Sequence, residues 1–228
     1  MPYFPVFLDL TDKSCLVVGA GDVGRRKICR LLDCGAGEVL IVDPQPPRDL
    51  MQELRSQARI GFACRPFEPD DLHGKFLVIA STGDQATNTL ISRLCEEQRI
   101  LCNIVDQPDK CSFIVPALVN RGELNIAVST SGASPALAGH IKTELAERYG
   151  PEYTAWVALL KRLRPLILEL GLSQSENKDI FQSLSDRENL ETITNGTNSA
   201  LQQALRERLP AALHQRLGAL LDDLVPDA

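Results

Sequence analysis

Three glycines near the N-terminus have the spacing of a phosphate-binding turn. Residues 19–24 read Gly-Ala-Gly-Asp-Val-Gly, directly after the apolar run Cys15–Val18 and directly before a helical pattern. In such a turn the first glycine permits the tight bend, the second lets the backbone approach a pyrophosphate, and the third lets the helix pack closely on the strand. The helix N-terminus offers free N–H groups and the positive end of its dipole to the anion. The turn therefore predicts dinucleotide binding.

An acidic residue stands where an adenosine ribose would be recognised. Asp43 ends the next predicted strand, 19 positions after Gly24. A carboxylate there accepts hydrogen bonds from the ribose and repels a 2′-phosphate, which favours NAD over NADP, although Arg48 is close enough in sequence to accommodate the extra phosphate. The alternative is a glycine turn that serves only packing. We predict NAD as the cofactor, bound by the following residues: Gly19, Gly21, Asp22, Val23, Gly24, Asp43, Pro44 and Thr82.

Short apolar runs and helical patterns alternate along the first hundred residues. The runs are aliphatic and bounded by turn residues, which is typical of strands buried on both faces. We expect strands at Ser14–Val18, Val39–Val42, Phe76–Ala80 and Ile100–Val105, and helices at Asp22–Cys34, Asp49–Ala58 and Gln85–Gln98. Strand–helix alternation of this kind predicts an α/β fold with a doubly wound parallel sheet, covered by helices on both faces.

The pattern changes after Pro116. Leu124–Val128 alternates as a half-exposed strand does, and a Ser/Thr/Gly-rich turn follows it. Ser134 suits the N-cap and Pro135 the first position of a helix that runs to about Tyr149. Beyond Pro151 only helical spacing is convincing, at residues 155–170, 177–184 and 201–221. We therefore expect three parts: an α/β domain at 1–112, a strand–helix module at 113–150 and a helical region at 151–228.

Composition limits the classes of function. The 228 residues are 44% hydrophobic and 24% charged, which is ordinary for a globular protein. No apolar run approaches the roughly 20 residues that cross a bilayer, and no secretory signal is evident, so we expect a soluble cytoplasmic protein. A net charge of −6 argues against non-specific nucleic-acid binding. The seven cysteines form no CxxC pair and have no nearby histidine pair, so we expect reduced thiols and no metal site.

The residues around the glycine turn are more specific than a general fingerprint. The segments Pro5–Leu10 and Leu16–Lys27 resemble the opening of the siroheme-synthase dehydrogenase family, also called precorrin-2 dehydrogenases. Further matching segments follow in the same order: Ala80–Asp84, Asn103–Pro108, Phe113–Pro116, Arg121–Ser129 and Ser131–Ala138. The resemblance covers about two-thirds of the chain, whereas the region beyond Pro151 matches only in general character.

The resemblance implies an NAD-dependent oxidation of precorrin-2 to sirohydrochlorin, in siroheme or related tetrapyrrole synthesis. It implies a Rossmann domain, a dimerisation module that pairs two chains into a homodimer, and a helical C-terminal region. Some members of the family also insert ferrous iron into sirohydrochlorin. A bifunctional dehydrogenase and ferrochelatase is therefore one alternative, and a non-catalytic NAD-sensing module is another.

The resemblance also assigns residues to the reaction. The family's functional carboxylate corresponds to Asp106, just past a predicted strand, where a partly buried carboxylate could accept the ring proton. The other interpretation is that Asp106 only caps the turn before Pro108. Asn103 is expected to bind substrate, and so is the serine-rich turn, which could equally serve as a helix cap. That turn contains Ser129, Thr130 and Ser131, with Thr130 where some relatives carry a regulatory phosphoserine.

Two further expectations concern single positions. Many relatives have alanine where this chain has Gly24, and we expect either residue to permit close packing. Because a precorrin carries many carboxylates, basic side chains must meet it despite the negative net charge. The candidates in or beside matched segments are Arg25, Arg26, Lys110, Arg121 and Lys142, each of which could equally be a solvated surface charge.

Overall fold

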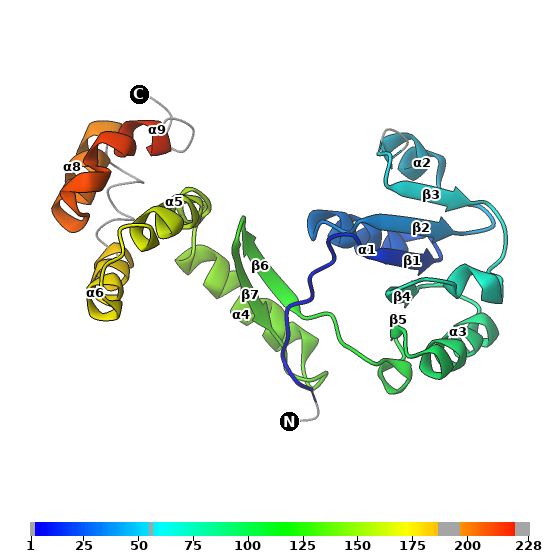
Figure 1. Cartoon of the computed structure of the whole chain (residues 1–228). Helices are drawn as coiled ribbons and strands as arrows, with labels where there is room; N and C mark the ends of the chain where they lie inside the picture. Colours follow the sequence, from blue (N-terminus) through cyan, green and yellow to red (C-terminus); the bar gives the residue numbers. More distant parts are fainter. Residues whose placement is uncertain (1–2, 55–56, 187–196, 222–228) are drawn as a thin grey trace. The chain divides into compact units, whose positions relative to one another are not determined.

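The computed structural model describes residues 3–54, 57–186 and 197–221. It divides the chain into two units, Met1–Val115 and Pro116–Ala228, each with its own core (Figure 1). This division lies close to the boundary expected after residue 112. The boundary expected after residue 150 falls inside the second unit, so the three-part organisation stays a prediction.

Five short apolar strands form the parallel sheet of the first unit. In chain order they are β1 (Ser14–Val18), β2 (Glu38–Val42), β3 (Ile60–Ala63), β4 (Leu77–Ala80) and β5 (Leu101–Ile104). Their spatial order is β3-β2-β1-β4-β5, and every neighbouring pair is parallel. The register aligns Val18 of β1 with Ala80 of β4, and Ala80 with Ile104 of β5. The loops that follow these three strands therefore share one edge of the sheet.

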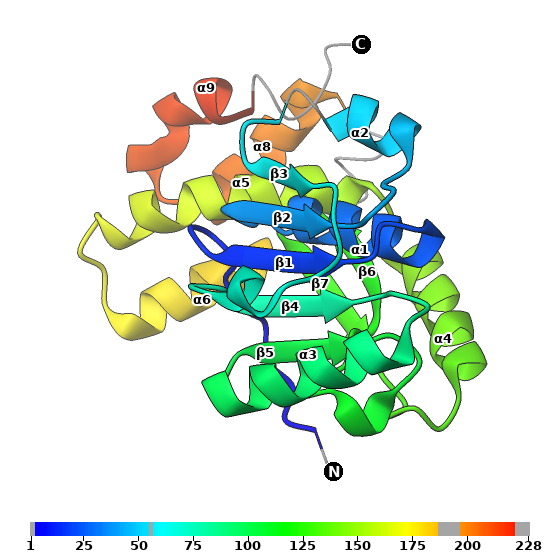
Figure 2. The same cartoon turned by 90° about the vertical axis from the view of Figure 1, so that its right-hand side faces the viewer.

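Helices cover both faces of this sheet (Figure 2). On one face, α1 (Asp22–Asp33) and α2 (Arg48–Leu54) bury Ile28, Leu31, Leu50 and Leu54 against β1, β2 and β4. On the other face, α3 (Gln85–Gln98) and the 3-10 turn η1 (Pro69–Leu72) bury Ile91, Cys95 and Leu72. The predicted doubly wound fold is confirmed.

The second unit begins with an antiparallel hairpin. Strands β6 (Ala117–Arg121) and β7 (Leu124–Val128) are joined through Gly122, which has a φ of +63°. Helix α4 (Pro135–Arg148) follows and packs against both strands. The Ser134 hydroxyl accepts a hydrogen bond from the Leu137 N–H at 3.2 Å, which is the expected N-cap.

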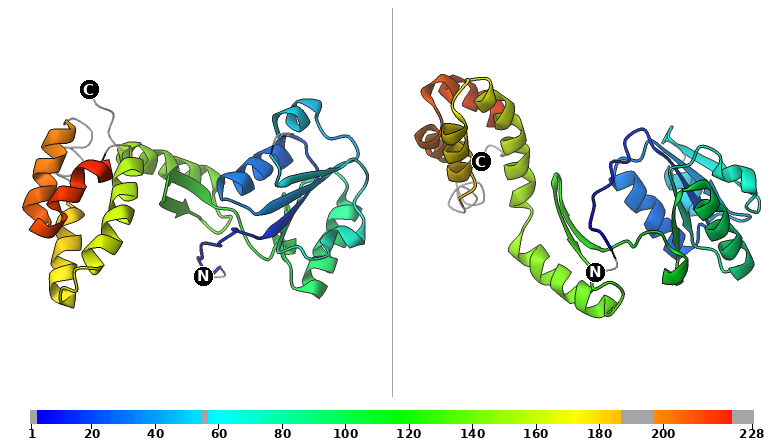
Figure 3. Two further views of the ribbon diagram at one scale, coloured as in Figure 1. Left: turned by 45° about the horizontal axis from the view of Figure 1, so that its top comes forward. Right: turned by 60° about the horizontal axis from the view of Figure 1, so that its bottom comes forward.

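Further helices enclose a separate hydrophobic core in the second unit (Figure 3). They are α5 (Glu152–Leu168), α6 (Gln174–Leu184), α8 (Asn198–Arg208), η3 (Ala211–Arg216) and α9 (Leu217–Leu221). The expected single helix over 201–221 is wrong. Helix α8 ends before Leu209, because Pro210 cannot donate a helical hydrogen bond and its ring disfavours a helical conformation in the residue before it. Among the described residues, no helix combines the length and apolarity that a membrane span requires.

Two strands were missed from the sequence. Strand β3 contains Gly61 and is only partly buried along its length, so it lacks the apolar run of the central strands. Strand β6 ends in Asn120 and Arg121, which hide its apolar start. Helix α2 is described as far as Leu54, and residue 57 is not helical, so the helix stops short of the expected Ala58. Part of the interval between the helical patterns expected at 177–184 and 201–221 lies outside the described residues.

Candidate functional site

The first and third glycines of the turn leave no room for a side chain. Gly19 directly follows β1 with a φ of +93°, and a Cβ there would lie 2.8 Å from the Ser81 carbonyl group. A Cβ on Gly24 would lie 2.0 Å from the Gly19 carbonyl oxygen and 2.8 Å from the Ser81 hydroxyl. These contacts force the chain to turn tightly and bring α1 directly onto the sheet edge.

The second glycine faces open space. No heavy atom lies within 4 Å of the position that a Cβ on Gly21 would take. Gly21 is the N-cap of α1, and the first helical hydrogen bond runs from the Arg25 N–H to the Gly21 oxygen at 2.8 Å. The N–H groups of Asp22, Val23 and Gly24 precede that bond and are available to an anion. The turn therefore fits the pyrophosphate of a dinucleotide.

Asp43 is fastened to this turn. Its Oδ2 atom accepts a hydrogen bond from the Ala20 N–H at 2.7 Å, and its Oδ1 atom accepts one from the Gln45 N–H at 2.7 Å. A carboxylate has about four acceptor positions, so two remain for ribose hydroxyls. Asp43 is partly buried and Pro44 beside it is exposed. The structure thus brings together the glycine turn and the expected ribose-binding carboxylate.

Ser81 is a residue of this site that sequence reasoning missed. Its hydroxyl donates hydrogen bonds to the carbonyl oxygens of Gly19 at 2.7 Å and Val18 at 3.3 Å. It therefore holds the turn after β1 against the end of β4. Ser81 lies in the segment Ala80–Asp84 that matches the family, which could have indicated it. From that segment only the neighbouring Thr82 was predicted as a site residue.

Thr82 is engaged within the first unit. Its hydroxyl donates to Asn88 Oδ1 at 2.8 Å, and the Asn88 amide donates back to the Thr82 carbonyl oxygen at 3.0 Å. Asn88 is buried on α3, so this pair fixes the loop after β4. Cofactor binding by Thr82 stays a prediction.

Asp106 lies on the turn after β5, at the same sheet edge. Because β4 alone separates β1 from β5, this turn lies about 10 Å from the glycine turn. Asp106 has a φ of +61°, a conformation that aspartate tolerates better than most residues. The expected partial burial is wrong: Asp106 is exposed, because it stands at the tip of the turn.

Neighbouring side chains hold the turn that carries Asp106. The Asn103 amide donates to the Phe113 carbonyl oxygen at 3.1 Å, and Asn103 is itself buried. The Cys111 sulfur accepts from the Ile104 N–H at 3.1 Å and lies 3.2 Å from the carbonyl oxygens of Ile104 and Gln107. Burial raises the pKa of Cys111, which keeps it a thiol that can donate to these oxygens. In this structure Asn103 supports Asp106, and its contact with substrate stays a prediction.

The serine-rich turn belongs to the second unit. The Thr130 hydroxyl donates to the Ser134 carbonyl oxygen at 3.1 Å and accepts from the Ser134 N–H at 3.0 Å. The Ser129 hydroxyl accepts from the Ser131 N–H at 3.0 Å. These bonds shape the entry to α4, as the helix-cap interpretation expects. Binding of substrate by Ser129, Thr130 and Ser131 stays a prediction.

The structure also shows a cavity away from the glycine turn, and its cysteines and acidic residues bear on a metal site. A cavity of about 360 Å³ lies between the end of α3 and residues 109–112, and of the residues expected to meet cofactor or substrate only the candidate cation Lys110 lines it. All seven cysteines are free thiols. Within the described ranges, no three His, Cys, Asp or Glu side chains are grouped so as to hold a metal ion.

Comparisons with known proteins agree with this geometry. Residues 6–117 match a family model described as NAD(P)-binding, and residues 121–148 match the model described as sirohaem biosynthesis protein central. The siroheme synthase of Nitrosomonas eutropha is 33% identical over 94% of this chain and 45% of its own length. That of Thioalkalivibrio sulfidiphilus is 34% identical over 95% of this chain and 44% of its own. The chain belongs to the siroheme synthase N-terminal family.

The solved structure of SirC, a precorrin-2 dehydrogenase, extends this family assignment to the fold. It is 28% identical in sequence, matches with a TM-score of 0.73, and the match covers 90% of this chain and 100% of SirC. The chain spans somewhat less than half the length of the siroheme synthases it matches, yet it accounts for all of SirC. The resemblance read from the sequence is thereby confirmed, and so is the Rossmann-type sheet.

Proposed function

We propose that this chain is an NAD-dependent dehydrogenase that oxidises precorrin-2 to sirohydrochlorin. One observation carries the proposal: the full length of SirC, a precorrin-2 dehydrogenase, superposes on this chain, whose own glycine turn and Asp43 fit a dinucleotide. An NAD-sensing module would need the glycine turn and Asp43 but would have no use for a carboxylate at Asp106.

The site residues divide the work of the reaction. The N-terminus of α1 binds the pyrophosphate, and Asp43 accepts hydrogen bonds from the ribose. Bound NAD supplies the hydride acceptor. Oxidation removes a hydride and a proton from the reduced ring, and the Asp106 carboxylate receives that proton before releasing it to solvent. Products are sirohydrochlorin, NADH and one proton, so atoms and charge balance.

The direct test is NADH formation from enzymatically generated precorrin-2 under nitrogen. We expect turnover with NAD by the wild-type chain and none by Asp106→Asn, while both bind NAD. Binding of NAD without any oxidation of precorrin-2 by the wild type would overturn the proposal and favour the NAD-sensing module.

Iron insertion is a second candidate activity, because the siroheme synthases this chain resembles are named for the metallated product. The iron would be a substrate, held weakly by oxygen atoms such as those of Asp106. Anaerobic incubation of sirohydrochlorin with Fe(II) tests it. Metallation no faster than without protein would remove this activity.

The proposal includes a cytoplasmic homodimer. Residues 121–148, which match the central domain of sirohaem biosynthesis proteins, fall within the module expected to pair two chains at 113–150. Analytical ultracentrifugation at micromolar concentration should show a dimer, and a monomer would refute this arrangement.

A further inference from the structure

Two candidate cations of the first unit have polar partners. Arg25 of α1 forms ion pairs with Asp49 and Glu53 of α2. The Lys110 ammonium donates a hydrogen bond to the Thr89 hydroxyl at 2.7 Å. These contacts tie helices and loops of the first unit together.

Arg121, in the second unit, is committed as well. Its guanidinium donates to the carbonyl oxygens of Tyr149 at 2.9 Å and Ala146 at 3.0 Å, at the C-terminal end of α4. A cation at that end stabilises the helix by satisfying its last carbonyl groups. The guanidinium of Arg121 therefore serves to stabilise the end of α4.

Lys27, the last residue of the basic run Arg25-Arg26-Lys27, is different. It lies on α1 one turn after Gly24, beside the buried Ile28, and it is itself partly buried. Across residues 3–54, 57–186 and 197–221, the Lys27 ammonium forms no hydrogen bond or ion pair. A cation withdrawn from water without a partner is unfavourable, so an anionic ligand there would stabilise it.

The charged and titratable groups that act on Lys27 include two residues of the loop after β5. Burial, followed by repulsion from Arg26 and Arg30, lowers the pKa of Lys27, whereas Cys111 and Asp106 act in the opposite direction. Lys27 is thus within electrostatic range of both residues of that turn.

Packing gives the same placement independently. Phe113 packs on the hydrophobic cluster that contains Ile28 and Leu31 of α1. The segment just after Cys111 therefore lies on the face of the sheet that α1 covers. Lys27 precedes Ile28 on that helix and lies one turn after Gly24, whose turn is at the same sheet edge as Asp106.

We propose that Lys27 binds a carboxylate of the tetrapyrrole substrate beside Asp106. This inference rests on the proposed function and names a substrate-binding residue of that site. A charge-assisted hydrogen bond from the ammonium would orient one edge of the ring toward the Asp106 carboxylate. Two opposite charges would then act side by side. The Lys27 ammonium on α1 binds a substrate carboxylate, and the Asp106 carboxylate after β5 accepts the ring proton.

Kinetics of Lys27→Met test the role. Losing a hydrogen bond to a charged group weakens binding by about 1.5–3 kcal/mol, which corresponds to roughly 10- to 150-fold. We expect KM for precorrin-2 to rise at least about 10-fold while KM for NAD changes less than about twofold, and Lys27→Arg to restore part of the loss. Arg93→Met removes an equal charge from the exposed Arg93–Glu97 pair on α3 and should leave both constants unchanged.

A binding measurement separates this inference from the proposed function. Anaerobic calorimetric titration with sirohydrochlorin should show a Kd weakened about 10-fold or more by Lys27→Met, whether or not the wild type oxidises precorrin-2. Sirohydrochlorin affinity unchanged by Lys27→Met, or an equal loss of NAD affinity, would overturn the role. If Lys27→Met does not fold, Lys27→Gln, which keeps a polar chain, is judged by the same criteria.

Discussion

The Ser81 hydroxyl donates a hydrogen bond to the Gly19 carbonyl oxygen at 2.7 Å, which ties the glycine turn to the end of β4. The same hydroxyl and carbonyl oxygen lie next to Gly24, and a Cβ on Gly24 would lie 2.0 Å from that carbonyl oxygen. The expectation that alanine would pack at position 24 as well as glycine is therefore wrong for this turn, because the obstacle is backbone that cannot rotate away.

Gly24→Ala should destabilise the protein. Forcing a methyl group into this contact must shift the turn, at a cost of about 1–3 kcal/mol in the free energy of unfolding. Urea denaturation measures the change. Gly21→Ala is the matched control, since nothing lies within 4 Å of its added methyl group. It should leave stability nearly unchanged and still raise KM for NAD, because the pyrophosphate must approach there. Equal stability of the two variants would contradict this account.

Asp43→Asn should relax the choice of cofactor. The amide keeps the volume of the side chain but lacks the negative charge that repels a 2′-phosphate. We expect KM for NAD to rise several-fold and KM for NADP to fall, so the ratio of kcat/KM between the cofactors moves toward NADP. The exposed Arg48 gives the phosphate a counter-charge. A ratio that stays the same would show that Asp43 is not the ribose-binding residue.

The central strands could be predicted because burial on both faces requires continuous apolar runs. Four of the five residues of β1 are buried, and its bounds match the prediction. Edge strand β3 needs no such run, since it is only partly buried, and its sequence carries no equivalent signal. Local composition thus reveals the middle of a sheet better than its border.

The same contrast holds for the site. The glycine turn and Asp43 follow from a local motif and its spacing. The role of Ser81 does not, because it depends on a contact between distant segments. The Ser81 hydroxyl meets the Gly19 carbonyl oxygen across 62 positions of sequence. No periodicity encodes such a meeting.

Asp106→Asn should abolish turnover and spare the cofactor site. Asparagine adopts the φ of +61° as readily as aspartate, so the turn keeps its shape while the proton acceptor is lost. We expect kcat to fall at least about 100-fold, the usual contribution of a general base, with an unchanged Kd for NAD. Asp109→Asn, an exposed residue on the same loop, serves as the control. If NAD affinity falls as far as activity, the loss is structural.

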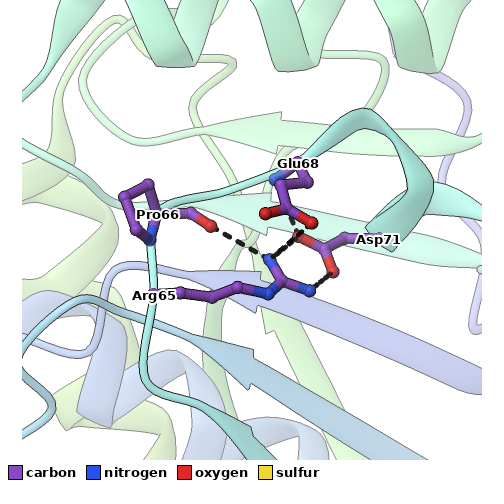
Figure 4. A network of polar contacts seen from close by, with 4 residues as sticks. All are labelled: Arg65, Pro66, Glu68 and Asp71. Atoms are coloured by element: carbon purple, nitrogen blue, oxygen red, sulfur yellow. Dashed lines mark hydrogen bonds and ion pairs between the residues drawn. The ribbon is translucent and has the colours of Figure 1, made fainter.

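The Arg65–Asp71 pair makes stability depend on acid pH (Figure 4). Asp71 is 4% exposed and accepts two hydrogen bonds from the Arg65 guanidinium, at 2.9 and 2.7 Å, and one from the Glu68 N–H at 2.9 Å. The Arg65 guanidinium lowers the pKa of Asp71. The ionised form therefore stabilises the fold above the unfolded-state pKa of about 3.9, and this stabilisation is lost as pH falls through the lower folded pKa.

Asp71→Asn should show this dependence directly. At pH 7 the variant loses hydrogen bonds to a charged group, so its free energy of unfolding should drop by about 1.5–3 kcal/mol. The difference in free energy of unfolding between the wild type and the variant should shrink as pH falls below about 4, because the wild-type carboxyl then takes up a proton and both side chains are neutral. Urea denaturation from pH 7 to pH 3 measures both. Asp70→Asn changes the exposed neighbour and should have the same free energy of unfolding as the wild type at each pH. If the difference between Asp71→Asn and the wild type stays constant with pH, then the shape of Asp71, and not its charge, is what stabilises the fold.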